Sequence, residues 1–129
     1  MKEAVNVIVQ KQNKILILKR SHTETHYQNL WDLPGGEIKK GEVLKDAAER
    51  EVMEESGLEV KADDNYFSIF HYDLTPAGEV FGFKAKIVKG KVSLSKEHTE
   101  FKWVSKKDFD KLEYTPSVSA FIREFFKKI

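Results

Sequence analysis

Three glutamates close to the end of a predicted helix are the side chains whose type and spacing best suit chemistry. Glu51, Glu54 and Glu55 end the segment 43–56. At about 100° of rotation per residue, they fall within roughly 100° of one another on one helix face. One to two turns earlier the same face is apolar and carries Leu44, Ala47 and Ala48. A face that begins as core therefore ends as a cluster of carboxylates.

A carboxylate cluster in this place is unfavourable by itself. Glu51 and Glu55 are like charges at positions i and i+4, which costs about 0.2–0.5 kcal/mol, and both face the negative end of the helix dipole. A divalent cation would reverse the sign of both effects. Clustered hard oxygen ligands suit Mg²⁺ or Mn²⁺, and the chain has no cysteine to favour a softer ion. The alternative at this point is an acidic face that is simply exposed to water.

The residues around these glutamates follow a known signature. Gly36, Glu42 and the run REVMEESGL at residues 50–58 fit the pattern G-x5-E-x7-R-E-U-x-E-E-x-G-U, in which U is a bulky apolar residue. Every fixed position is filled, with Val52 and Leu58 at the two apolar positions. Residues 36–58 therefore resemble the complete Nudix box, and the preceding WDLPGG resembles the family's usual approach to it. The resemblance implies a MutT-like Nudix hydrolase with an α+β fold, an αβα sandwich around a central mixed sheet.

The resemblance also implies a role for each residue of the box. Glu54 and Glu55 are the implied principal ligands of Mg²⁺ or Mn²⁺, and Gly36 contributes its carbonyl oxygen as a further ligand. Glu51 is either another metal ligand or the base that activates water. Arg50 is expected to hold the carboxylates in place by ion pairing.

Acidic residues at the edge of the signature and beyond it each have two alternative roles. Glu42 matches the first glutamate of the box, which is structural or binds the metal through water. Glu97 lies six residues before Trp103, in a region where MutT-like proteins often carry a catalytic glutamate on a loop. Glu100 competes with Glu97 for this role, and the alternative is that both are ordinary loop acids.

These residue types suit hydrolysis of a diphosphate linkage in a nucleoside diphosphate derivative. Divalent ions neutralise the diphosphate and lower the pKa of bound water, and a carboxylate, Glu51 or Glu97, then takes the proton. We expect a nucleoside triphosphate pyrophosphohydrolase, with ADP-ribose or a nucleotide sugar as the alternative substrate. Two further alternatives are a Nudix module that binds nucleotide without catalysis and a metal-stabilised structural domain.

Three residues outside the box are candidates for contacts with a nucleotide substrate. Arg20 ends the second predicted strand and is a candidate phosphate ligand, with an ordinary surface arginine as the alternative. Trp31 and Phe83 are candidates to stack on a base or ring. The alternative for both aromatic residues is a place in the core.

The elements that must position these residues follow from hydrophobic periodicity and from glycine and proline. The segment 43–56 is the helix that carries the glutamates, with Gly41 near its start and Gly57 as a left-handed stop. Thr115 and Pro116 open a last, amphipathic helix, and residues 105–112 are a candidate short helix. Residues 21–30 form a loop. Strands are predicted at residues 5–9, 15–18, 66–73, 79–88, 91–94 and 101–104.

Composition sets the outer limits of these expectations. The chain has 129 residues, the size of a single domain spanning 1–129. Its 22 basic and 21 acidic residues nearly cancel, which argues against a stable nucleic-acid or membrane partner. No apolar run reaches the length of a signal peptide or a membrane span. We expect a soluble cytoplasmic protein, monomer or homodimer.

Overall fold

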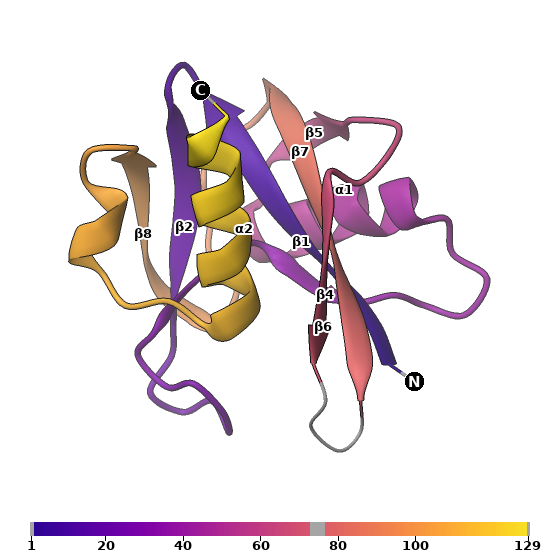
Figure 1. The fold of residues 1–129 in the computed structure, drawn as a ribbon, viewed down its shortest axis with the longest axis horizontal. Helices are drawn as coiled ribbons and strands as arrows, with labels where there is room; N and C mark the ends of the chain where they lie inside the picture. Colours follow the sequence, from indigo (N-terminus) through magenta and orange to yellow (C-terminus); the bar gives the residue numbers. More distant parts are fainter. Residues whose placement is uncertain (1, 73–76, 129) are drawn as a thin grey trace.

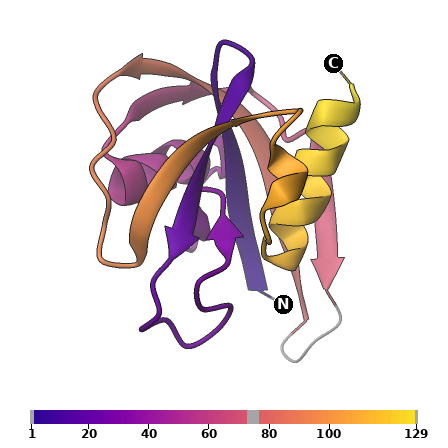
Figure 2. The same ribbon diagram turned by 90° about the vertical axis from the view of Figure 1, so that its left-hand side faces the viewer.

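The computed structural model describes residues 2–72 and 77–128 and consists of one mixed sheet between two helices (Figures 1 and 2). The helical elements are α1 (Leu44–Ser56), the short 3-10 helix η1 (Phe109–Lys111) and α2 (Pro116–Lys127). The strands are β1 (Lys2–Lys11), β2 (Lys14–Arg20), β3 (Trp31–Asp32), β4 (Gly35–Glu37), β5 (Glu59–Ala62), β6 (Ser68–Tyr72), β7 (Gly78–Lys89) and β8 (His98–Ser105). This arrangement confirms the predicted αβα sandwich around a mixed sheet.

The sheet is organised around β1. This strand runs parallel to β7 and antiparallel to β2 and β4. β7 also pairs with β5 and β6, while β2 pairs with β3 and β8, all antiparallel. The end of β2 therefore lies beside the start of β8, where Arg20 is opposite His98, and β3 lies along the other edge of β2.

The two helices lie on opposite sides of the sheet, as Figure 2 shows, and each has its own core. Because successive side chains of a strand point to opposite faces, Leu16 and Leu18 of β2 join the core under α1, whereas Ile15 and Ile17 join the core under α2. All four are fully buried. In the described residues no helix is long and apolar enough to cross a membrane.

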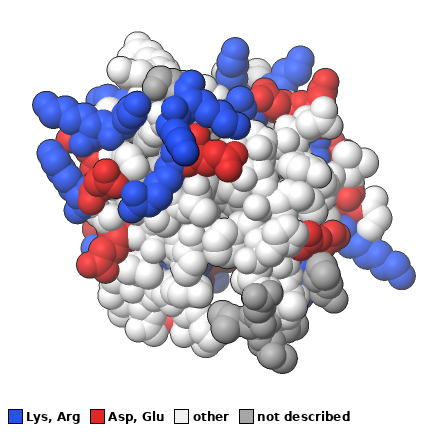
Figure 3. All heavy atoms as spheres, in the orientation of Figure 1, with Lys and Arg blue, Asp and Glu red and all other residues white. Residues whose placement is uncertain are grey.

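Charge is distributed unevenly over the surface although the formal net charge is only +1. In Figure 3, basic side chains crowd the upper left of the face, over the end of the molecule that carries the β1–β2 turn, the end of β8 and the C-terminal end of α2. Lys11 pairs with Lys14 in the sheet, and Lys14 pairs with Ser105 next to Lys106. The box glutamates are not part of this basic cluster.

Several predicted elements were wrong in extent. The predicted strand at 91–94 is irregular chain, because Val92 and Leu94 pack on the core from a loop that bonds to the end of α1, with the Ser93 amide donating to the Ser56 carbonyl at 2.7 Å. The predicted helix at 105–112 is reduced to η1. Of the predicted strand at 66–73, β6 accounts for Ser68–Tyr72, and Asp73 lies outside the described residues.

The short strands β3, β4 and β5 were not predicted. β4 consists of two glycines and a glutamate, a poor strand sequence, and it pairs with β1 because its backbone approaches that strand closely. A Cβ atom on Gly35 would lie only 2.1 Å from the Val5 carbonyl oxygen. The glycine therefore permits the contact that places the start of the box against the sheet.

Candidate active site

The C-terminal half of α1 carries the glutamate cluster on the face that packs on the sheet. Ala47 and Ala48 are fully buried, and Glu55 continues this buried face with only 7% of its surface exposed. The Glu51 side chain is 12% exposed, whereas Glu54 lies at the edge with 48% exposed. The predicted change from apolar to acidic along one face is confirmed.

The two ends of the helix differ from each other. α1 begins at Leu44, one residue after the predicted start, with an extended Val43 and no side-chain cap. Glu42 instead accepts a hydrogen bond from the Lys39 amide, which closes the preceding loop. At the other end Gly57 has φ 74°, the predicted left-handed stop.

Arg50 is bonded to three glutamates of the box. Its guanidinium donates to Glu42 at 2.7 and 3.0 Å, to Glu51 at 2.7 Å and to Glu54 at 2.7 Å, and also to the Glu37 carbonyl at 3.2 Å. The bonds from Arg50 are the main reason that the pKa of Glu42 is lowered to about 2. The same bonds raise the pKa of the guanidinium itself. The geometry has the ion pairs that the resemblance implies for Arg50.

Glu55 is the most perturbed acid of the site. Burial is the largest cause that raises its pKa to about 10, and a hydrogen bond with Glu97 and the nearby charges of Glu97 and Asp32 raise it further. One hydrogen bond opposes this effect, because the Gly35 amide donates to the Glu55 carboxylate at 2.9 Å. Glu55 thus connects the end of α1 to β4.

Glu51 lies directly against the backbone of Gly36. A Cβ atom at Gly36 would be 2.6–2.7 Å from the atoms of the Glu51 carboxylate, so a side chain there would push the carboxylate away. Burial raises the pKa of Glu51, with smaller contributions from the charges of Glu54 and Glu97, although Arg50 acts in the opposite direction. The absence of a side chain at Gly36 therefore leaves space for the Glu51 carboxylate.

The structure brings Glu97, and not Glu100, to the box glutamates. Glu97 lies close enough to Glu55 and Glu51 to raise the pKa of both acids. Its loop is held in place by the Ser21 amide, which donates to the Glu97 carbonyl at 2.8 Å. Glu100 is paired with Lys19 at 3.4 Å on β8 and β2.

Arg20 lies at the end of β2, with 20% of its side chain exposed. Its guanidinium donates to Asp32 at 3.2 Å, to Glu24 at 3.2 Å and to the His26 carbonyl at 3.1 Å. Asp32 in turn lies close enough to Glu55 to raise the pKa of that acid. Arg20 is therefore connected to the site through Asp32 rather than being an isolated surface arginine.

Asp32 and His98 are site residues that the sequence did not single out. The His98 side chain is 1% exposed, and its Nε2 lies 3.7 Å from Asp32 Oδ2. Within the described part of the chain, neither ring nitrogen of His98 has a hydrogen-bond partner. Asp32 is in the WDLPGG approach and His98 follows Glu97, but only the pairing of β2 with both β3 and β8 brings the two together.

The burial of Trp31 and Phe83 does not favour the substrate contacts that were predicted for them. Trp31 is 6% exposed and belongs to the core under α2, which is on the other side of the sheet from the glutamates. Phe83 is 1% exposed in the core under α1. Because neither ring has a free face, the core alternative holds for both.

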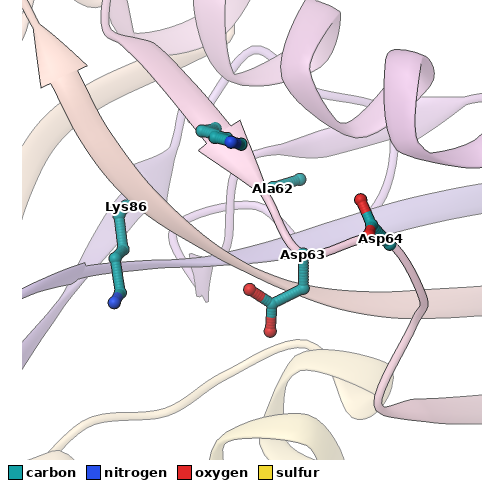
Figure 4. Close-up of a pocket in the computed structure, with 5 residues that line it drawn as sticks. Ala62, Asp63, Asp64 and Lys86 are labelled. Atoms are coloured by element: carbon teal, nitrogen blue, oxygen red, sulfur yellow. The ribbon is translucent and has the colours of Figure 1, made fainter.

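Two surface hollows are less suited to chemistry than the carboxylate cluster. One, of about 380 Å³, is lined by Lys61, Ala62, Asp63, Asp64 and Lys86. Figure 4 shows Lys86 extending from β7 and Asp63 from the segment after β5, with charges of both signs and no box residue. The other, of about 430 Å³, is lined by residues 37–42 together with Lys2, Glu3 and Leu44. Of the glutamates of the box, this hollow borders Glu42 alone. We therefore place the candidate site at Glu51, Glu54, Glu55 and Glu97.

The donor atoms of this site suit a hard divalent cation. Glu51, Glu54 and Glu55 offer carboxylate oxygens, the ligands that Mg²⁺ and Mn²⁺ prefer, and Gly36 has no side chain to displace the Glu51 carboxylate. Over residues 2–72 and 77–128, no three acidic or histidine side chains are spaced to hold an ion as they stand. Two of the box carboxylates, Glu51 and Glu54, are instead bonded to Arg50.

Comparisons with known proteins find relatives over most of the chain. The chain is 29% identical over 113 residues to an ADP-ribose pyrophosphatase of Methanocaldococcus jannaschii, covering 86% of this chain and 66% of that protein's length. It is 30% identical over 122 residues to an 8-oxo-dGTP diphosphatase of Buchnera aphidicola, covering 95% of this chain and 91% of the relative. The crystal structure of a MutT protein from Methanosarcina mazei Go1 has a TM-score of 0.77 and 30% identity, over 98% of this chain and 91% of that one.

The family model for the NUDIX domain matches residues 1–125. This range includes the box, the strands that surround it and most of α2. The chain therefore belongs to the Nudix hydrolase family.

Proposed function

We propose that this chain is a divalent-metal-dependent pyrophosphohydrolase that cleaves the diphosphate linkage of a nucleoside triphosphate. The observation that carries the proposal is that Glu51 and Glu55 lie against the glycines of β4 with raised pKa values, while Glu97 is close enough to raise the pKa of both. Acids with perturbed pKa values cluster at catalytic sites. Nudix family members generally use Mg²⁺ or Mn²⁺.

Glu54, Glu55 and the Gly36 carbonyl would hold the ion, with Glu51 as a further ligand or base. The bound ion supplies neutralisation of the diphosphate charge and a lower pKa for bound water. Glu51 or Glu97 accepts the proton of the attacking water. The hydroxyl adds to phosphorus, the bond to the bridging oxygen breaks, and a nucleoside monophosphate and pyrophosphate leave.

Arg50 and Arg20 have supporting tasks in this proposal. Arg50 keeps Glu42, Glu51 and Glu54 in position through the bonds described above. Arg20 reaches a phosphate oxygen while it remains bonded to Asp32, because a guanidinium has five N–H donors and only some of them are used within the protein. Its charge there offsets that of the diphosphate.

The choice of a nucleoside triphosphate is supported by the bacterial relative whose name is 8-oxo-dGTP diphosphatase and whose length this chain nearly matches. ADP-ribose is the second candidate, supported by the archaeal relative named an ADP-ribose pyrophosphatase. A module that only binds nucleotide is disfavoured because every glutamate of the box is present in this chain.

The test is a panel of nucleoside triphosphates, ADP-ribose and nucleotide sugars with Mg²⁺, with Mn²⁺ and with a chelator. The released nucleoside monophosphate is measured chromatographically for every compound, and pyrophosphate is measured for the triphosphates. We expect pyrophosphate from at least one nucleoside triphosphate, and only when the metal is present. The Glu54→Gln protein, purified in the same way, controls for a contaminating phosphatase. Absence of hydrolysis across the panel with both metals would overturn the proposal.

A further inference from the structure

Phe101 is an exposed aromatic residue in the row of side chains that leads to the site. It lies on β8 opposite Leu18 of β2, and Leu18 lies opposite Asp32 of β3. Adjacent strands are about 4.8 Å apart, so Phe101 and Asp32 are separated by roughly 10 Å across the sheet. Asp32 lies three residues before Gly35, whose amide donates to the Glu55 carboxylate at 2.9 Å.

Phe101 points to the same side of the sheet as the box glutamates. Trp103, two residues further along β8, packs against the core under α1. Lys102, between them, lies over the Trp31 ring on the α2 side, 5.7 Å from its centroid. Because strand side chains alternate, Phe101 shares the α1 side with Trp103 and Leu18.

The ring of Phe101 is backed by protein but not covered by it. Leu18, its cross-strand neighbour, is fully buried, whereas Phe101 is 43% exposed. Tyr66 has a similar exposure of 42%, but its ring rests on Phe81 and Phe83 at centroid distances of 5.1 and 6.4 Å. An exposed apolar ring next to a polar site is a surface on which a flat ligand can stack.

We propose that Phe101 stacks on the nucleobase of a nucleotide whose diphosphate lies at the box glutamates. This inference rests on the proposed function and specifies it, because it requires a substrate with an aromatic base. The distance from Phe101 to Asp32 is of the size that a ribose and its phosphate bridge. Every base has a π face, so stacking alone gives weak discrimination between bases. Phe101 takes over the stacking role that the burial of Trp31 and Phe83 denies to those residues.

The kinetic test compares Phe101→Ala, Phe101→Trp and Tyr66→Ala on the best nucleoside triphosphate. Base–aromatic stacks are strong enough that Phe101→Ala should raise KM about tenfold or more while kcat changes little. Phe101→Trp should keep the wild-type KM, because it keeps a ring. Tyr66→Ala, a matched exposed aromatic away from β8, should leave both constants unchanged. An unchanged KM for Phe101→Ala would overturn the stacking site.

A binding test separates this inference from the hydrolytic proposal. A nucleoside monophosphate and ribose 5-phosphate are titrated into the wild-type and Phe101→Ala proteins without metal, and NMR chemical-shift changes are followed. The stacking site predicts that Phe101→Ala weakens the nucleoside monophosphate about tenfold and leaves ribose 5-phosphate unaffected. If the wild type hydrolyses no nucleotide but shows this difference, the hydrolytic proposal fails and the stacking site stands. Equal binding of the monophosphate by both proteins, or none by the wild type, overturns the stacking site.

Discussion

Helices α1 and α2 cover opposite faces of one sheet, but they are built in different ways. α2 buries an aromatic and aliphatic stripe consisting of Val118, Phe121, Ile122 and Phe126. α1 buries small residues first and then Glu55 and Ser56. One helix contributes mainly apolar packing, while the other brings carboxylates to the sheet at a cost in stability. The difference separates the part of the molecule that serves the core from the part that serves chemistry.

The ends of the two helices show the same contrast. α2 begins with Pro116 in its first turn and has Lys127 in its last turn, as its dipole favours. Neither helix has a side-chain cap, but α1 has no basic residue in its last turn, where Glu54 and Glu55 lie instead. α1 is held by Arg50, by the bond of Glu55 to β4 and by the left-handed Gly57.

The largest expected effect is on turnover. Glu51→Gln and Glu54→Gln keep the shape of the side chain but remove its charge, so we expect kcat to fall by about 10²–10⁴ while the fold is retained. Far-UV circular dichroism checks the fold. Glu124→Gln on α2 is the matched control, because Glu124 bonds only to groups away from the site such as Ser68, and it should keep wild-type activity. Near wild-type turnover of both box variants on a confirmed substrate would refute the assignment.

The next effect should be confined to the α2 side. The Phe121 ring is 1% exposed, packs on Gly82 and lies 5.9 Å from the Phe67 ring. Phe121→Ala should therefore lower the free energy of unfolding by about 3–5 kcal/mol, measured by urea denaturation. Turnover per folded molecule at low temperature should stay near wild type. A loss of turnover larger than the loss of folded protein would contradict the separation of the two faces.

The parts of this structure that depend on local pattern were predictable from the sequence. Periodicity predicted α1, α2 and the long strands, and fixed spacing identified Arg50 and the box glutamates. β4 and β5 are short and have little intrinsic strand preference, and they are strands because β1 and β7 offer them partners. A single sequence does not contain that information locally.

Site residues that lie on separate strands were harder to predict from the sequence. Asp32, His98 and Phe101 come together through the register of β2 with β3 and β8, which includes a bulge at Lys19/Arg20. A shift of one residue in a strand moves a side chain to the other face. Trp31 was therefore a candidate for stacking, but its ring lies on the α2 side of the sheet. Asp32, the next residue, lies on the α1 side with the box glutamates.

The third prediction concerns the dependence of stability on pH. The pKa of Glu55 is about 10 in the folded chain against an ordinary value of 4.5. Above pH 4.5 the unfolded chain therefore loses this proton before the folded chain does, and stability falls as pH rises from about 5 toward 10. Glu55→Gln should be more stable than wild type at pH 8 without metal, by about 2 kcal/mol, and nearly equal at pH 4.

Urea denaturation at several pH values, with and without Mg²⁺, measures this effect. Added Mg²⁺ should stabilise the wild type at pH 8 but stabilise Glu55→Gln much less, since the amide is a poor ligand. The opposite result would be the same change in unfolding free energy between pH 5 and 8 in the wild type and in Glu55→Gln. That result would show that Glu55 is ionised before any cation binds.

The smallest expected effect is at the ends of the helices. Gly57 ends α1 with φ 74°, whereas α2 ends at Lys128 with φ −91°, a value that any residue adopts. Gly57→Ala places a Cβ in the left-handed region and 3.3 Å from the Ser93 Cβ, so it should cost about 1–2 kcal/mol in unfolding free energy. Lys128→Ala should cost no more than about 0.5 kcal/mol, the value of its surface pair with Glu124. Equal costs at the two ends would mean that α1 does not depend on its glycine stop, and that Arg50 and β4 alone hold the glutamates.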